Sequence, residues 1–231
     1  MGDRGPGDGT DYEGVIEEAD RLCDFRGMRA WIEKEFPQRH DAYRIVYSPL
    51  RGAFHFTVTV RDGRDASEIL MFVAPPVHVH ADPDLGTDSD ADADRRMTRR
   101  GRACRIVFTE IDHNYVNPTS DGYLDEIERA LPDWETWNES GAYRSAYATF
   151  NEYLTWALFS LYALETYPPE EAEAMVEAKV RRMEESRGFV RYRAFNEALV
   201  ALYRSRAPEE TVASLYPGII GLFAKGEVRG P

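Results

Sequence analysis

The chain has few cysteines and no long apolar runs. Its 231 residues include two cysteines, Cys23 and Cys104, which are too few and too far apart to predict a disulfide framework or a cysteine metal site. We therefore expect two reduced, partly buried thiols. The longest apolar run, residues 153–164, contains Thr155 and Ser160 and is too short to cross the hydrocarbon core of a bilayer.

Positive charge is also scarce. The chain carries 28 Lys and Arg against 41 Asp and Glu, a formal net charge of -13. Such a surface repels both the phosphate backbone of nucleic acids and anionic membranes, so we expect neither as a partner. Residues 1–11 are rich in Gly and Asp, which predicts a disordered tail without the apolar segment of a secretory signal. We therefore expect a cytoplasmic protein.

Several catalytic motifs are missing. The sequence has no Gly-rich phosphate loop, no Gly-x-Ser-x-Gly elbow and no Cys/His nucleophile pattern. These absences disfavour nucleotide-binding enzymes of the common types, serine hydrolases and cysteine proteases, and they direct attention to acid–base or metal chemistry.

Hydrophobic patterning predicts one α+β domain over residues 12–231. An interrupted helical period covers residues 12–36, and β-branched runs predict a small antiparallel sheet in the N-terminal half. Residues 81–105, rich in Asp and then in Arg, predict a mobile charged loop. The expected strands are 43–48, 53–61 and 68–73, and the expected later helices are 121–131, 141–167, 170–186, 188–204 and 208–223.

The most informative stretch is residues 106–118, which we predict to be a mostly buried helix ended by Pro118. At helical spacing, Glu110, His113 and Asn117 share one face of an otherwise apolar rod. A buried carboxylate is costly unless it finds a cation, a donor or a metal, or stays protonated.

This spacing is close to the zinc motif His-Glu-x-x-His, in which the Glu acts as general base and both His side chains bind the metal. Glu110 and His113 occupy the base and the second ligand position, whereas Thr109 stands at the first. Downstream, Asn151 and Glu152 lie on a second apolar helix. Their order and type match the third metal ligand of zinc peptidases that use a glutamate there.

Three stretches together resemble an uncharacterised bacterial family of unknown function: residues 108–118, residues 150–156 and Ser48-Pro49-Leu50. Many members of that family carry a zincin-like His-Glu-x-x-His helix followed by Val-Asn-Pro, and the likeness runs from about residue 43 to the C-terminus. The resemblance implies a zincin-like helical C-terminal half and metal-dependent hydrolysis of an amide in a peptide or protein substrate. It also implies the site residues: Glu110 as general base, and His113 and Glu152 as ligands of one divalent metal, zinc first.

Thr109 leaves three alternatives open. Glu110 could itself be a ligand beside His113 and Glu152, a set of two carboxylates and one imidazole that suits iron or manganese. Another histidine could take the first position; the candidates are His55, His78 and His80. In the third alternative no metal binds, His113 pairs with Glu110 or Glu152 in a buried network, and the protein is a binding or interaction module.

Two further interpretations carry less weight. A ferritin-like di-iron site requires the Glu-x-x-His motif twice, and one copy is present. Asp112 points to a different face of the predicted helix from His113, so we expect it at the surface or in contact with a metal ligand rather than on the metal.

Overall fold

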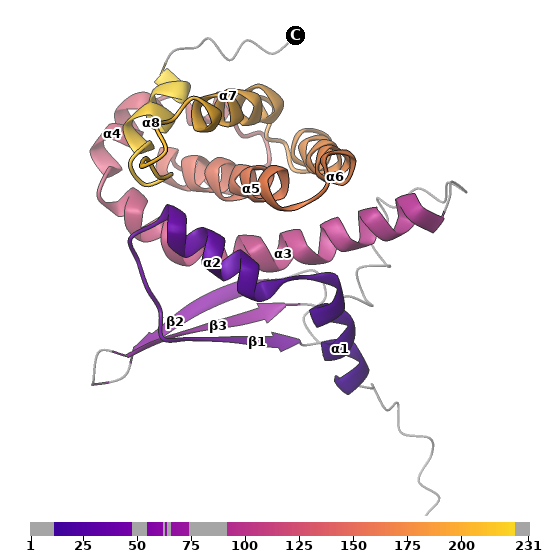
Figure 1. Ribbon diagram of the computed structural model, residues 1–231. Helices are drawn as coiled ribbons and strands as arrows, with labels where there is room; N and C mark the ends of the chain where they lie inside the picture. Colours follow the sequence, from indigo (N-terminus) through magenta and orange to yellow (C-terminus); the bar gives the residue numbers. More distant parts are fainter. Residues whose placement is uncertain (1–11, 48–54, 62, 64–65, 74–91, 225–231) are drawn as a thin grey trace, which may run out of the picture.

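The computed structural model describes residues 12–47, 55–61, 63, 66–73 and 92–224. The predicted disordered tail, His78 and His80 lie outside these residues. Within them the predicted α+β class is confirmed: a small sheet is formed by the N-terminal half, and the C-terminal half is helical (Figure 1). None of the helices in the described part combines the length and the apolar character needed to cross a membrane.

The sheet has three strands in the order β1-β3-β2. Strands β2 (Phe56–Arg61) and β3 (Ser67–Val73) pair antiparallel, as the sequence predicts. Strand β1 (Ala42–Tyr47), however, pairs parallel with β3, so the sheet is mixed and the prediction of a purely antiparallel sheet is wrong. The reason is topological: β3 lies between β1 and β2, so consecutive β1 and β2 are not neighbours.

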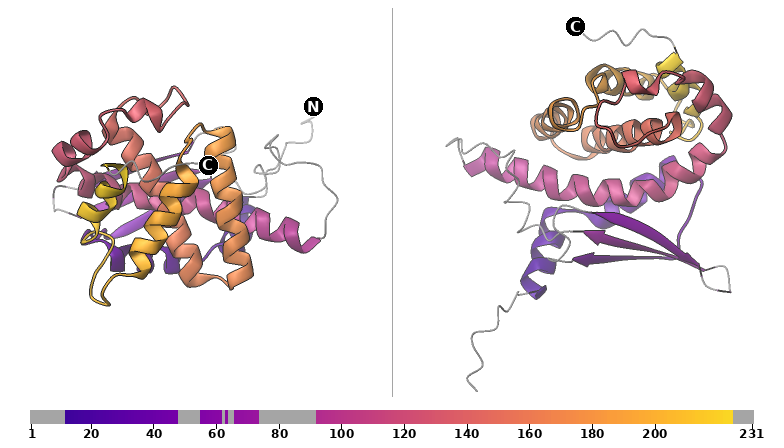
Figure 2. Two further views of the ribbon diagram at one scale, coloured as in Figure 1. Left: turned by 90° about the horizontal axis from the view of Figure 1, so that it is seen from above. Right: turned by 180° about the vertical axis from the view of Figure 1, so that it is seen from behind.

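Helix α3 (Asp92–Asp121) forms the middle layer, with the sheet on one side and the C-terminal helices on the other (Figures 1 and 2). The alternating exposure of β3 follows from this arrangement, because every second side chain faces inward and is buried. The predicted mobile loop is wrong for residues 92–105, which belong to α3. Arginine is a good helix former, and burial of Gly101 and Cys104 anchors this part of the helix against its neighbours.

Pro118 does not end α3, contrary to prediction, because the helix continues to Asp121. Proline lacks one backbone donor, and the Thr119 hydroxyl donates to the Tyr115 carbonyl at 2.8 Å in the same turn. The end of α3 curves toward the C-terminal helices (Figure 2), as expected for a helix bent at proline.

The first two helices are α1 (Tyr12–Leu22) and α2 (Phe25–Glu35). The break falls at Cys23 and Asp24 rather than at Gly27, because the Asp24 carboxylate caps α2 by accepting from the Gly27 amide at 2.8 Å. Cys23 is bonded to Cys104 of α3 in a disulfide, with 5.2 Å between the Cα atoms. The expectation of two reduced thiols is therefore wrong.

The C-terminal helices surround α5 (Ala146–Thr166), which is buried on nearly every face. Helix α8 (Tyr216–Ala224) starts later than predicted, and Pro217 stands in its first turn, where a missing donor costs nothing, instead of interrupting it. The remaining helical segments are α4 (Leu124–Ala130), η3 (Trp134–Thr136), α6 (Pro169–Arg181), the π-helical turn η4 (Arg182–Ser186) and α7 (Tyr192–Arg204).

Candidate functional site

The predicted site residues meet between α3 and α5. Glu110, Asp112 and His113 come from α3, Glu152 comes from α5, and Arg187 follows η4. We call these five residues the α3–α5 centre. Burial is the largest influence on the pKa values of Glu110, Asp112 and His113, and the negative charge of Glu152 also acts on all three, so the helices bring the sequence-predicted residues into one electrostatic cluster.

Glu152 has a strong partner that the sequence analysis did not anticipate. Its Oε1 accepts from Arg187 Nη2 at 2.6 Å and from the Trp156 indole at 2.8 Å. The Glu152 side chain is 6 % exposed and that of Arg187 is 21 % exposed, so little water competes for this pair. Arg187 also donates to the Tyr143 hydroxyl at 2.6 Å and stacks on the Trp156 ring at 4.5 Å. The Glu152 carboxylate is thus held by a fixed cation.

A tight turn at the end of η4 fixes the position of Arg187. The π turn of η4 ends α6, and Gly188 then adopts a φ of +71°. A Cβ atom at Gly188 would lie 2.9 Å from the Ser140 amide nitrogen, so a larger residue does not fit. The Gly188 carbonyl accepts from the Glu139 amide at 2.8 Å, which ties this turn to the loop before α5.

The other two carboxyl groups hold their protons unusually well. Burial, and then the charge of Glu152, raise the pKa of Glu110 from its ordinary value of 4.5 to about 7. Burial raises the pKa of Asp112 well above its usual range, and the charges of Glu110 and Glu152 add to the effect. Neither Asp112 oxygen makes a hydrogen bond of ordinary geometry with the described residues, although the Thr155 hydroxyl lies close enough to oppose the shift slightly.

Asp112 is therefore not at the surface, which corrects that alternative of the sequence interpretation. Its side chain is fully buried. The physical reason is that α5 and the other C-terminal helices cover more of α3 than the face of His113, so Asp112 also faces α5, where Thr155 and Glu152 act on its carboxyl group.

The surroundings of His113 favour its neutral imidazole. Burial lowers the pKa of His113 below its ordinary value; Glu152 and Asn117 oppose the shift and Arg187 reinforces it. Its Nδ1 is buried and makes no hydrogen bond of ordinary geometry with the described residues. The ion-pair partner of Glu152 is Arg187, rather than the His113 that one sequence alternative paired with it.

A second polar cluster lies beside the centre and was not anticipated from the sequence. Lys179 of α6 is fully buried and donates to the Ser160 hydroxyl of α5 and, at 3.0 Å, to Asn196 Oδ1 of α7. Ser160 donates to the same Asn196 oxygen at 2.6 Å. Burial lowers the pKa of Lys179 well below its ordinary value, and the nearby charge of Arg105 adds to this shift. The sequence carried one signal for this cluster: Lys179 lies between Ala178 and Val180, two residues predicted to face the core.

The α3–α5 centre does not fit a metal in this arrangement. No group of three or more His, Cys, Asp and Glu among the described residues is placed to hold a metal ion. One oxygen of the Glu152 carboxylate, Oε1, already accepts from a guanidinium and an indole, so a metal at this carboxylate would face the positive charge of Arg187. Thr109, at the missing ligand position, donates its hydroxyl to the Ile106 carbonyl at 3.0 Å. His55 precedes β2, on the sheet side of α3, and α5 lies on the other side.

Arg187 and Lys179 are the residues of these two clusters that sequence reasoning missed. Arg187 stands outside any predicted motif, and its role depends on the turn at Gly188. In this geometry Arg187 neutralises the charge of Glu152, and burial favours the protonated forms of Glu110 and Asp112. No family model matches this chain, and no curated protein and no solved structure matches it either.

Proposed function

We propose that this protein is a metal-independent binding module in which the α3–α5 centre stabilises the helical half. The observation that supports this most directly is the contact of 2.6 Å between Arg187 and Glu152. A guanidinium and a divalent cation compete for the same carboxylate, and here the guanidinium holds it. The same contact counts against the iron or manganese alternative, because that site also needs Glu152.

A metal-dependent hydrolase acting on an amide of a peptide or protein is the second candidate. Its support is the raised pKa of Glu110, about 7, which is the range in which a general base is most effective near neutral pH. The neutral His113 imidazole is also the protonation state that a metal ligand requires. Since the residues do not fit a metal as arranged, we derive no catalytic step.

Metal content separates the two candidates. Purified protein would be incubated with zinc, iron or manganese, dialysed and measured by plasma mass spectrometry beside His113→Ala and Arg187→Met. We expect no retained metal in any of the three proteins. Retention of about one zinc per chain that is lost in His113→Ala would overturn the binding module and support the hydrolase. Retained iron or manganese lost in the same variant would overturn it in favour of the two-carboxylate site.

Arg187→Met gives an independent readout. Removing one partner of a buried ion pair costs about 3–5 kcal/mol of unfolding free energy, because the other charge is left uncompensated. We expect urea unfolding to show this loss, with no recovery when zinc is added. Arg144→Met, at an exposed position, is the matched control. Recovery of stability by zinc in Arg187→Met would show that the centre is a metal site which the arginine blocks.

For partners and location we keep the expectations from charge and composition as proposals: no nucleic acid, no membrane and a cytoplasmic site of action. The charge of -13 supports the first two. The disulfide between Cys23 and Cys104 is the observation that weighs against the third, because disulfides persist mainly in oxidising compartments.

A further inference from the structure

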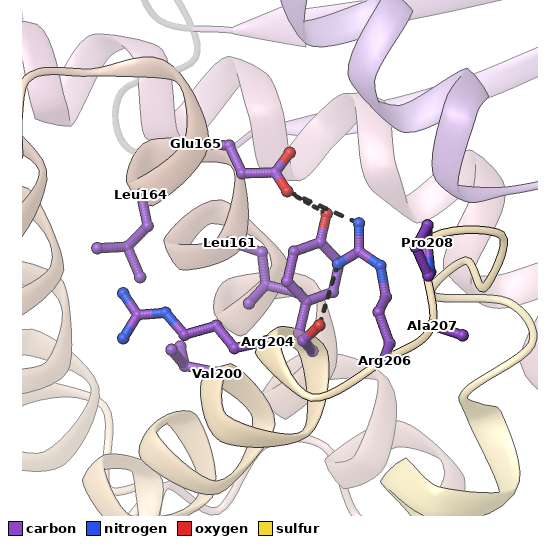
Figure 3. Close-up of a pocket in the computed structure, with 9 residues that line it drawn as sticks. Leu161, Leu164, Glu165, Val200, Arg204, Arg206, Ala207 and Pro208 are labelled. Carbon is purple, nitrogen blue, oxygen red and sulfur yellow. Dashed lines mark hydrogen bonds and ion pairs between the residues drawn. The ribbon is translucent and has the colours of Figure 1, made fainter.

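A pocket opens on the molecule away from the α3–α5 centre, between the C-terminal ends of α5 and α7. It has a volume of about 310 Å³, at the lower end of the range of small-ligand sites. Its apolar wall comes from both helices and from the segment after α7 (Figure 3). The apolar lining residues are Leu161, Leu164, Val200, Ala207 and Pro208.

Two of the polar groups that line the pocket are already engaged. Glu165 Oε1 accepts from the Tyr203 hydroxyl at 2.8 Å, and its Oε2 accepts from the Trp31 indole at 2.8 Å. Arg206 lies 3.2 Å from Glu35 and 3.7 Å from Glu165, and it also donates to the Tyr203 carbonyl. Glu35 also lies 3.5 Å from the Lys34 ammonium, so the two carboxylates of this network are matched by two cations.

Arg204 is the charged residue of this pocket that has no ion-pair partner among the described residues. It is exposed and, among the described residues, makes no hydrogen bond and no ion pair. Its side chain extends beside Leu164, on the opposite side of the pocket from Arg206 (Figure 3). The pocket therefore offers one free guanidinium next to an apolar wall, and this pairing suits a ligand with an anionic head and an apolar body.

We propose that this pocket binds a small organic monocarboxylate with a short aliphatic chain. The carboxylate pairs with Arg204, and the chain lies against Leu161, Leu164 and Val200. A single negative charge is favoured because Arg204 is the one guanidinium lining the pocket without an ion-pair partner among the described residues, whereas Arg206 is already paired with Glu35 and Glu165. This inference rests on the proposed binding function and names its ligand class.

Hexanoate is the probe, and hexanamide is its neutral counterpart of nearly equal shape. Binding would be followed by protein NMR shifts during titration into the full chain. We expect hexanoate to bind at least tenfold more tightly than hexanamide or inorganic phosphate, with the largest shifts at the pocket residues. Equal binding of hexanoate and hexanamide, or tighter binding of phosphate, would overturn the proposal.

Variants localise the effect. Arg204→Gln should weaken hexanoate binding about tenfold while hexanamide binding stays unchanged, since only the charge-assisted pair is removed. Arg181→Gln, on the exposed end of α6, is the matched control and should bind like the parent. Val200→Trp should block both ligands by filling the pocket. Because Arg204 is exposed, its variant should fold normally, which circular dichroism would check.

The outcome is separable from that of the proposed function. Retained zinc together with Arg204-dependent hexanoate binding would reject the metal-independent module and keep this pocket. Absence of metal together with hexanoate binding that ignores Arg204→Gln would reject the pocket and keep the module.

Discussion

Glu110 illustrates, at the scale of single residues, how the surroundings of a side chain decide its protonation. The residue is 8 % exposed and its carboxyl group lies near a second carboxylate, so the neutral form is favoured. Lys179 shows the same effect for a base, because its neutral amine is favoured in a fully buried site. Each group therefore links the stability of the fold to pH.

For Glu110 the sign is clear. The folded pKa of about 7 lies above the ordinary 4.5, so the folded state binds more protons between these values, and stability falls as pH rises through that window. Glu110→Gln removes this loss. We expect the variant to gain up to about 3 kcal/mol over the parent at pH 8 and nothing at pH 4.5.

Urea unfolding at pH 4.5, 6 and 8 would check this expectation. Glu135→Gln, at an exposed position, is the control and should follow the parent at every pH. A gain for Glu110→Gln that is the same at all three pH values would contradict the raised pKa of Glu110.

Lys179→Met tests the buried amine. Below the ordinary Lys pKa of 10.5 the unfolded chain binds a proton that the folded site disfavours, so the parent loses stability as pH falls. Methionine removes that loss, and Ser160 can still donate to Asn196. Replacing buried ionic groups by apolar ones of similar size is neutral or stabilising by about 1–4 kcal/mol, and we expect a gain in this range at pH 6.

The measurement is thermal unfolding at pH 6 and pH 10, with Lys34→Met as control because that lysine side chain is 62 % exposed. The gain should shrink toward pH 10. A lower melting temperature of Lys179→Met at both pH values would mean that the amine contributes more through its hydrogen bonds than it loses through burial.

At the scale of elements, α3 organises the molecule. One helix contacts the sheet, the N-terminal helices and the C-terminal bundle, and its inward faces carry both apolar and ionisable side chains. On the sheet side, Asn114 accepts from Thr59 at 2.8 Å and donates to Thr57 at 3.0 Å. On the other side lie Glu110, Asp112 and His113. Because α3 is covered on two sides, several of its polar side chains are buried: Asn114 satisfies its amide by hydrogen bonds to the sheet, whereas Asp112 stays buried with a raised pKa.

The link between α3 and the N-terminal helices is also covalent. The Cys23–Cys104 disulfide closes a loop with a sequence separation of 81 residues. In the chain-entropy model a loop of this length contributes about 4 kcal/mol, because it restricts the unfolded chain. We expect a reducing agent to lower the unfolding free energy by an amount of this order.

Urea unfolding with and without dithiothreitol would measure the effect, and the double variant Cys23→Ser/Cys104→Ser should not respond to the reductant. A thiol count tests the compartment. Free thiols would be alkylated at cell lysis, and the number of alkylated cysteines would then be counted in the denatured protein. No free thiols would reject the cytoplasmic proposal, whereas two free thiols would support it and would show that the cysteines are reduced in the cell.

At the scale of the whole molecule, the charged groups are sorted by depth. The formal net charge is -13, and in the described part the buried carboxyl groups are compensated by a proton, as at Glu110, or by an arginine, as at Glu152 with Arg187 and at Glu35 with Arg206. The pocket at Arg204 lies on a different part of the bundle from the α3–α5 centre, and the two can be tested separately.

The sequence by itself determined the class of the fold and most of its elements. Hydrophobic periodicity and turn residues are local signals, and they predicted the helical second half, the three strands and the hairpin between β2 and β3. They also placed Glu110, His113 and Glu152 on apolar helices, because ionisable residues within apolar runs are visible in the sequence itself. The metal that the motif suggested stays a prediction.

The tertiary structure decided which groups meet, because contacts between distant segments leave no local signal. The parallel pairing of β1 with β3 depends on the path of the chain through the sheet. The disulfide depends on α1 ending beside α3. The partner of Glu152 depends on the turn at Gly188, which brings Arg187 to within 2.6 Å of a carboxylate 35 residues earlier. That one contact changes the preferred interpretation of the centre from a metal site to a buried ion pair.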